Sequence, residues 1–242
     1  MSNISDLLFE KKECAKVFST ASDVGKKLNI PVYLVGGSVR DLLMGKESYK
    51  DIDLMVEKDS GTFSKELAKA LKVKTIIPFE KFHTYKIPYK DIEIEIAAAR
   101  KETYNPDSRK PNKVILTSIE DDLSRRDFRV NAIAVSLLKD NLGEIYDPLK
   151  GITDLQNKIL ITPKDPDTTF SDDPLRMLRA IRFSTTLNFE IDHKIKESIK
   201  EQSHRIKIIS YERITAEIIK ILSCEKPSIG FYLLKETNLL EY

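Results

Sequence analysis

Apolar and polar positions alternate with a period of two along several stretches of the first half of the chain, which predicts β-strands there. In residues 51–56 the acids Asp51 and Asp53 alternate with apolar side chains, and residues 91–97 alternate acids with isoleucine and alanine. Successive side chains of a strand point to opposite faces, so each stretch has one acidic and one apolar face. Five further strands are predicted at residues 32–35, 74–77, 82–87, 132–137 and 144–146.

Apolar residues that recur every three or four positions predict helices elsewhere. Residues 101–113 follow neither period and are rich in proline, asparagine and charge, so a mobile loop is expected. Strands mixed with helices come first and helices alone follow residue 172, which predicts an α/β (α+β) domain over 1–153 and an all-α domain over 154–242. The predicted helices are 6–28, 39–44, 64–71, 175–187, 193–206, 211–222 and 228–240.

Composition narrows the cellular compartment and the binding partners to be expected for this protein. Its 242 residues are 41% hydrophobic and 32% charged, with a net charge of +2, so nucleic-acid contacts would have to come from local patches. Cys14 and Cys224 fit no metal-binding spacing and indicate a reducing compartment. The N-terminus does not have the pattern of a signal peptide, and no apolar stretch is long enough for a bilayer. We therefore expect a cytoplasmic location and no membrane partner.

The pair Asp51 and Asp53 is the first candidate for chemistry. Two carboxylates on one strand face repel and raise each other's pKa unless a cation lies between them. Oxygen-only ligands favour Mg²⁺, and phosphoryl-transfer enzymes hold two such ions roughly 4 Å apart. A third acid could come from the strand at 91–97, where alternation does not distinguish Glu93 from Glu95. The structural alternative is an exposed strand with a wet acidic face.

A glycine pair precedes this strand. Gly36 and Gly37 follow the apolar strand at 32–35, and a helix then begins with Ser38 and Arg40. Glycines let a backbone approach phosphate, and a helix start offers unpaired N–H groups to it. The glycines alone could form a tight bend, but together with the aspartates they indicate a nucleotide site.

This combination, GGSVRDLL followed by DID, resembles the nucleotidyltransferase fold of DNA polymerase beta and the terminal RNA nucleotidyltransferases. The longer motif resembles the branch with class II CCA-adding enzymes and bacterial poly(A) polymerases. The resemblance implies a catalytic head of polymerase-beta type with a mixed sheet, and a helical neck that recognises the base. It implies that Asp51, Asp53 and Glu95 are catalytic and bind Mg²⁺, since relatives carry an acid five residues before an arginine, here Arg100.

A second motif lies in SRRDFRVNAIAVSL, residues 124–137. The guanidinium groups of Arg125 and Arg126 match phosphate geometry, and Asp127 and Asn131 offer polar groups to a ribose. The alternative is surface charge pairing with the acids at 120–122. The segment resembles the family's RRDxxxN motif, which implies nucleotide binding and sugar recognition by these four residues.

A third motif is expected at a helix start, where residues 171–173 precede Pro174. Asp173, Arg176 and Arg179 are spaced by three residues and share one side of the helix. An acid with an arginine one turn on is also a common stabilising pair. The segment resembles the family's EDxxRxxR motif, whose acid and first arginine pair with the incoming base, although Asp172 replaces the usual glutamate.

Further similarities extend the resemblance over residues 32–240. Asp147 and Gly151 fall in the family's hinge motif, the loop at 101–113 matches one needed for the final A, and Arg213 and Glu217 fall in a helix-stabilising motif. His83 replaces a common glycine, and we assign it no catalytic role. Relatives continue with helices of a body and tail that are absent here, so weaker tRNA binding is expected.

The resemblance implies a template-independent nucleotidyltransferase that uses Mg²⁺, CTP and ATP to add CMP and AMP to the 3′ end of tRNA, with release of pyrophosphate. The motifs do not separate this enzyme from a bacterial poly(A) polymerase or from an enzyme that adds only CC or only A. A non-catalytic nucleotide- or RNA-binding remnant is the alternative from another class.

Overall fold

The computed structural model describes residues 3–10, 12–46, 51–105 and 108–242, with the backbone alone for residues 12, 102–105 and 108–113. The chain divides into two compact units. The first, here the sheet unit, comprises residues 1–101, 114–124 and 131–149. The second, the helical unit, comprises residues 102–113, 125–130 and 150–242.

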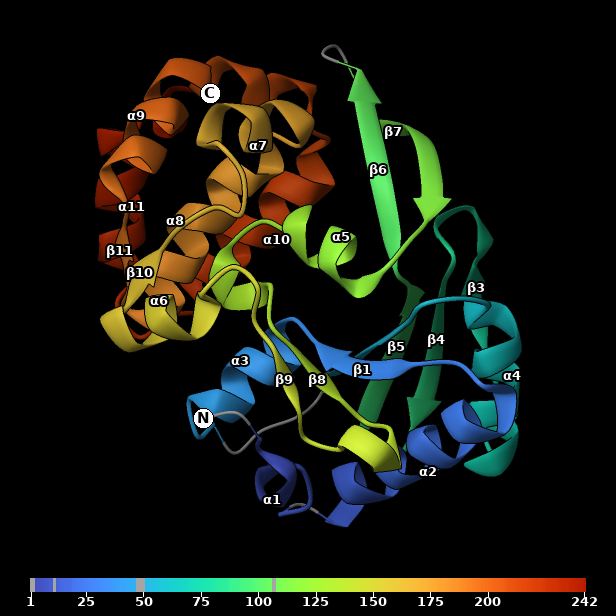
Figure 1. Ribbon diagram of the computed structural model, residues 1–242. Helices are drawn as coiled ribbons and strands as arrows, with labels where there is room; N and C mark the ends of the chain where they lie inside the picture. The colour runs from blue at the N-terminus through green and yellow to red at the C-terminus, as the bar shows by residue number, and fades with distance from the viewer. Residues whose placement is uncertain (1–2, 11, 47–50, 106–107) are drawn as a thin grey trace. The chain divides into compact units, whose positions relative to one another are not determined.

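The sheet unit is built on a seven-stranded mixed sheet, as predicted (Figure 1). The strand order is β3-β4-β5-β2-β1-β8-β9, in which β2 and β5 are parallel and the other neighbours antiparallel. Parallel neighbours need a long connection, and here the chain between β2 and β5 contains a helix and two strands. The strands are β1 (Val32–Val35), β2 (Asp51–Val56), β3 (Ile77–Phe79), β4 (Thr84–Tyr89), β5 (Ile92–Ala98), β8 (Ala134–Ser136) and β9 (Ile145–Tyr146).

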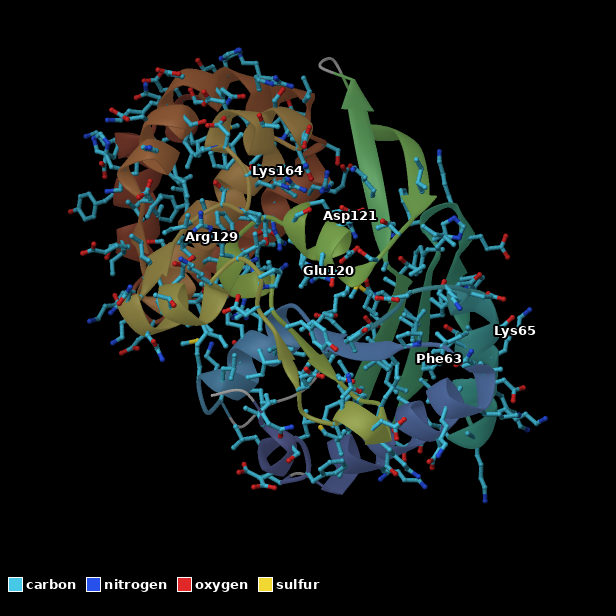
Figure 2. The ribbon with its side chains drawn as sticks, viewed as in Figure 1. Phe63, Lys65, Glu120, Asp121, Arg129 and Lys164 are labelled. Atoms are coloured by element: carbon cyan, nitrogen blue, oxygen red, sulfur yellow. The ribbon has the colours of Figure 1, made fainter. Side chains whose placement is uncertain are left out.

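Amphipathic helices cover this sheet. In α4 (Ser60–Ala70) the fully buried Phe63 and the exposed Lys65 lie on different faces, and both are labelled in Figure 2. Helix α4 packs against α2 (Lys12–Leu28). The remaining helices of the unit are α1 (Ser5–Leu8), α3 (Gly37–Leu43) and α5 (Ile119–Ser124), with 3-10 turns η1 (Glu80–Phe82) and η3 (Lys139–Asn141).

The helical unit has a core of apolar side chains around α8 (Leu175–Leu187), including Phe170, Met177 and Ile181. Two short parallel strands, β10 (Ile159–Leu160) and β11 (Glu190–Ile191), accompany the helices. The other elements are α6 (Gly151–Asn157), α7 (Pro166–Asp172), α9 (His193–Gln202), α10 (Tyr211–Leu222), α11 (Pro227–Glu236) and the 3-10 turns η4 (Ser203–Ile208) and η5 (Leu239–Glu241). The 3-10 turn η2 (Arg129–Asn131) spans a boundary along the sequence, because residues 125–130 belong to the helical unit and residues 131–149 to the sheet unit.

The expectation of an irregular loop at residues 101–113 is wrong. Strands β6 (Arg100–Asn105) and β7 (Ser108–Leu116) form a two-stranded sheet there. Each strand of a two-stranded sheet has only one partner, so a proline is tolerated on the unpaired edge and no alternation of apolar residues is required. The composition therefore resembled that of a loop.

Several other boundaries differ from the prediction. The helix predicted at 6–28 is formed by α1 and α2, and the strand predicted at 74–77 begins at Ile77. The expected helix start at residues 171–173 is wrong, because Ser171 and Asp172 end α7 and α8 begins at Leu175. Strands β4 and β5 form an antiparallel hairpin. No helix in the described part of the chain is long and apolar enough to cross a membrane.

Candidate active site

Four acidic residues line one face of the strand pair β2–β5. In the parallel register Asp51 lies opposite Glu93 and Asp53 opposite Glu95. Their neighbours Ile52 and Ile94 are fully buried on the other face. Asp51 and Glu93 are exposed, whereas Asp53 and Glu95 are half-buried. Strand alternation therefore holds the predicted aspartate pair beside both candidates for the third acid.

Lys86 on β4 neutralises part of this acidic face. It pairs in register with Glu95, and its Nζ forms an ion pair with Glu93 and lies 3.6 Å from Glu95 Oε2. The hydrogen bond to Glu93, followed by the charge of Glu95, raises the pKa of Lys86. Lys86 was not predicted from the sequence as part of the site. The signal was available, because a hairpin turning at residues 88–91 places Lys86 opposite the acids of β5.

These carboxylates have the chemistry of a magnesium site. Among the described residues no group of three or more His, Cys, Asp or Glu side chains is close enough to hold a metal ion. The donors are nevertheless all oxygens, as Mg²⁺ prefers, and they face the same way from strands about 4.8 Å apart. Asp51, Asp53 and Glu95 therefore have the donor chemistry that a divalent ion requires, and their role as its ligands stays a prediction.

Ser38 fixes the strand that carries the aspartates. Its Oγ donates to the carbonyl oxygen of Asp51 at 3.2 Å and accepts the N–H of Asp53 at 3.1 Å. Gly36, just before α3, has φ +68° and ψ −136°, a conformation that glycine adopts without a steric penalty. The predicted glycine segment is therefore joined to the aspartate strand through one hydroxyl group.

Arg40 forms hydrogen bonds with the side chains of Asp41 and Asn131. It is 8% exposed, its Nε and Nη2 each donate to the Asp41 carboxylate at 3.0 Å, and its Nη1 donates to Asn131 Oδ1 at 2.6 Å. Asn131 is itself buried. The guanidinium thus connects α3 to the last residue of the RRDxxxN motif. Asp41 was not singled out from the sequence, although it directly follows Arg40.

In the helical unit, the RRD segment forms a turn. Arg125 and Arg126 are half-buried, and Asp127 is buried with its Oδ1 accepting the N–H of Phe128 at 2.8 Å. Arg129, labelled in Figure 2, ties this segment to residues 161–162, because its N–H donates to the Ile161 carbonyl at 2.8 Å and its Nε to the Thr162 carbonyl at 3.3 Å.

Asp173 and Arg176 have separate partners. Asp173 lies between α7 and α8 with an extended backbone, and its carboxylate accepts the N–H of Leu175 and the guanidinium of Arg213, each at 3.1 Å. Arg176 donates to the carbonyl oxygen of Arg125 at 2.8 Å. The predicted base-reading acid and arginine are therefore both held in place by groups from other segments of the unit.

Arg179 binds Asp127. Its Nε and Nη2 donate to Asp127 Oδ2 at 2.8 and 2.6 Å, and its Nη1 lies 3.9 Å from Glu217 Oε1. Burial opposes the charge of Arg179, but the carboxylates of Asp127 and Glu217 outweigh it and raise the pKa of this guanidinium. The structure thus joins the RRD motif to the DDPLRMLR segment through a partly buried ion pair.

Comparisons with known proteins agree with these motifs. Residues 32–161, more than half of the chain, match the family model described as the poly A polymerase head domain. Residues 188–242 match a second model, described as the probable RNA and SrmB-binding site of polymerase A. The chain belongs to the poly(A) polymerase head-domain family. This confirms the resemblance inferred from GGSVRDLL, DID and RRDFRVN.

Relatives in this family include a CCA-adding enzyme of Lactobacillus helveticus, 34% identical over 226 residues, which are 93% of this chain and 53% of that enzyme. An A-adding tRNA nucleotidyltransferase of Aquifex aeolicus is 39% identical over 169 residues, 70% of this chain and 20% of that protein. The chain spans about half the length of the CCA-adding relatives it matches.

Solved structures of this family share the fold. A CCA-adding enzyme in apo form II aligns with a TM-score of 0.87 and 30% identity, covering 99% of this chain and 56% of that one. The Thermotoga maritima CCA-adding enzyme in complex with tRNA gives a TM-score of 0.83 and 29% identity, covering 99% of this chain and 55% of that one. Other matches are CCA-adding enzymes in complex with CTP and with ATP. The predicted nucleotidyltransferase head and helical neck are therefore correct.

Proposed function

We propose that the protein is a template-independent nucleotidyltransferase that adds CMP and AMP to the 3′ end of tRNA. The observation that carries this proposal is the register that aligns Asp53 with Glu95 and leaves Asp51 on the same face. The likeness to CCA-adding enzymes supports it, and so do the CTP, ATP and tRNA found in complexes of those proteins.

In the sheet unit, Asp51, Asp53 and Glu95 would hold Mg²⁺. A bound divalent ion lowers the pKa of a hydroxyl group and stabilises charge that develops on phosphate oxygens. Ser38 keeps the aspartate strand in place through its two backbone hydrogen bonds, so both carboxylates are presented from a fixed backbone. The backbone at Gly36 and Gly37, without side chains, gives a triphosphate close access, and Arg40 orients Asn131 beside it.

In the helical unit, the nucleotide is bound and identified. Arg125 and Arg126 offer guanidinium groups to phosphate oxygens. Asp127 accepts a hydrogen bond from the ribose, while Asp173 and Arg176 present an acceptor and donors to the base edge. Each such bidentate base contact is worth roughly 1–3 kcal/mol of discrimination.

The test is to incubate the protein with Mg²⁺, labelled CTP or ATP, and a saturating concentration of tRNA that lacks its terminal CCA, and to size the products. We expect extension by CMP, CMP and AMP and then arrest. Arrest after CC, addition of A only to tRNA that ends in CC, or a long A tract would replace the proposal with the corresponding partial enzyme or a poly(A) polymerase. No extension, with CTP and ATP still bound, would indicate a binding module.

A substitution at Arg176 separates base recognition from triphosphate binding. We expect Arg176→Ala to accept UTP and GTP about tenfold more readily relative to CTP and ATP, because the base edge loses its donors. Inorganic triphosphate should bind as it does to the unchanged protein. A variant with unaltered base choice would remove Arg176 from the recognition site.

A further inference from the structure

Helix α10 carries two charged residues, one turn apart, on its contact with α8. Arg213 and Glu217 are four positions apart, and Glu217 is 4% exposed although it is charged. A buried carboxylate is costly unless it is paired, and Glu217 pairs with Arg182 and with Lys220 at 3.5 Å. The stability of the contact between α8 and α10 does not by itself explain why Arg213 pairs with Asp173 and Glu217 with Arg182.

Arg213 determines the orientation of Asp173. The two oxygens of this carboxylate have different partners, the N–H of Leu175 for Oδ1 and the guanidinium of Arg213 for Oδ2. The N–H of Leu175 alone would leave the carboxylate free to turn about its terminal bond, which has broad torsional preferences. With both partners, the plane of the carboxylate is fixed, and the lone pairs that remain point in defined directions.

Glu217 acts on Asp127 through arginines. Arg179 donates twice to Asp127 Oδ2 and lies next to Arg182, which donates to Glu217. Burial and the neighbouring charge of Arg179 lower the pKa of Arg182, so the two guanidinium groups repel each other. Glu217 neutralises one of them. Without its charge, Asp127 would remain as a carboxylate whose charge acts on both guanidinium groups, and its orientation toward a ligand would change.

We propose that Arg213 and Glu217 are positioning residues for two separate parts of nucleotide recognition, Arg213 for the base through Asp173 and Glu217 for the sugar through Arg179 and Asp127. This inference rests on the proposed function of the site. Neither residue needs to touch the nucleotide. Helix α10 thereby influences base discrimination through Arg213 and ribose discrimination through Glu217, which lies one turn further along the same face.

A purely stabilising role makes a different prediction. If the ion pairs only hold α8 and α10 together, loss of either one would loosen the whole unit and weaken base and ribose discrimination in proportion. Separate positioning predicts that each substitution affects one discrimination and spares the other. The two ratios must therefore be measured on the same variants.

The experiment measures equilibrium dissociation constants for CTP, UTP and dCTP by dialysis with labelled nucleotides and Mg²⁺, on the full chain. Arg213→Met and Glu217→Gln are the test variants, since both nearly preserve side-chain volume. Arg213→Lys tests rescue by a positive charge. Lys196→Met is the matched control, because Lys196 forms a 3.4 Å ion pair with Glu236 in the same unit without contacting either acid. Circular dichroism monitors folding of each variant.

We expect Arg213→Met to lower the CTP-to-UTP preference about tenfold with the CTP-to-dCTP preference unchanged, and Arg213→Lys to restore part of it. Glu217→Gln should lower the ribose preference about tenfold and leave base preference intact. Lys196→Met should change neither. Parallel changes in both ratios, or none in folded variants, would overturn this inference. A wild-type protein that fails to distinguish CTP from UTP would overturn the proposed function itself.

Discussion

Asp53 and Glu95 are register partners on the parallel strands β2 and β5, so their carboxylates leave the sheet from the same face. Glu93 has the same relationship with Asp51, and strand geometry alone leaves both glutamates eligible as the third acid. They differ in their contact with Lys86, which forms a hydrogen bond with Glu93 and a longer ion pair with Glu95.

That difference predicts unequal effects of neutralising the two glutamates. Glu95→Gln should lower Mg²⁺-dependent nucleotide incorporation about a hundredfold, because it removes the proposed metal ligand opposite Asp53. Glu93→Gln should lower it less than about threefold, since this carboxylate is held by Lys86. Initial rates over a range of Mg²⁺ concentrations provide the measurement. The reverse order of effects would assign the third ligand to Glu93.

Lys86 should compete with divalent ions for the acidic face. Removing its charge in Lys86→Met leaves Glu93 and Glu95 without their lysine partner, so Mg²⁺ should bind about threefold to tenfold more tightly to the acidic face. In EDTA the same variant should melt about 1–2 °C lower, because the partly exposed ion pairs are worth at most about 1 kcal/mol. Calorimetric titration and thermal melting test both. Unchanged Mg²⁺ affinity would show that Lys86 does not oppose metal binding.

His83 has a left-handed backbone, with φ +49° and ψ 40°. Its side chain is exposed, while its N–H and carbonyl oxygen bond to Glu80 and Ser60. A non-glycine residue pays about 1–2 kcal/mol for this conformation, so His83→Gly should raise the free energy of unfolding by about 0.5–1 kcal/mol without loss of activity. His83→Ala should give no such gain. Urea denaturation followed by circular dichroism provides the comparison, and a destabilised glycine variant would contradict it.

Asp59 gives α4 a pH-dependent cap. Its carboxylate accepts the N–H and the hydroxyl of Thr62, and these bonds lower the pKa of Asp59. A carboxyl with a lowered pKa stabilises the folded state above its unfolded pKa, and this contribution is lost as pH falls through the folded value. Asp59→Ala should therefore cost about 1 kcal/mol at pH 7 and progressively less toward pH 3. A pH-independent difference between variant and wild type would exclude a charged cap.

The sequence predicted those parts of the fold that local periodicity specifies. The alternation in residues 51–56 and 91–97 identified β2 and β5, and with them the common face of Asp51, Asp53 and both glutamates. The apolar pattern of residues 175–187 and 211–222 identified α8 and α10. Periodicity failed at β6 and β7, because a two-stranded pair needs no apolar face.

The contacts between elements distant in sequence were not predictable in this way. Lys86 reaches the acids of β5 only through the hairpin register, and the pairing of Arg179 with Asp127 spans 52 residues. The spacing of Asp173 and Arg176 indicated a shared helix face, but the break between α7 and α8 gave each residue its own partner. The roles of individual residues in Mg²⁺ and nucleotide binding stay predictions.

The most direct test of the account is the rate of labelled CMP transfer to tRNA lacking CCA by Asp53→Asn, compared with Asp91→Asn. Asp91 is an exposed acid in the β4–β5 turn, outside the strand face that carries Asp53. The account predicts a loss of at least about a hundredfold for Asp53→Asn, with the melting temperature retained, and wild-type transfer for Asp91→Asn. Undiminished transfer by folded Asp53→Asn would contradict it.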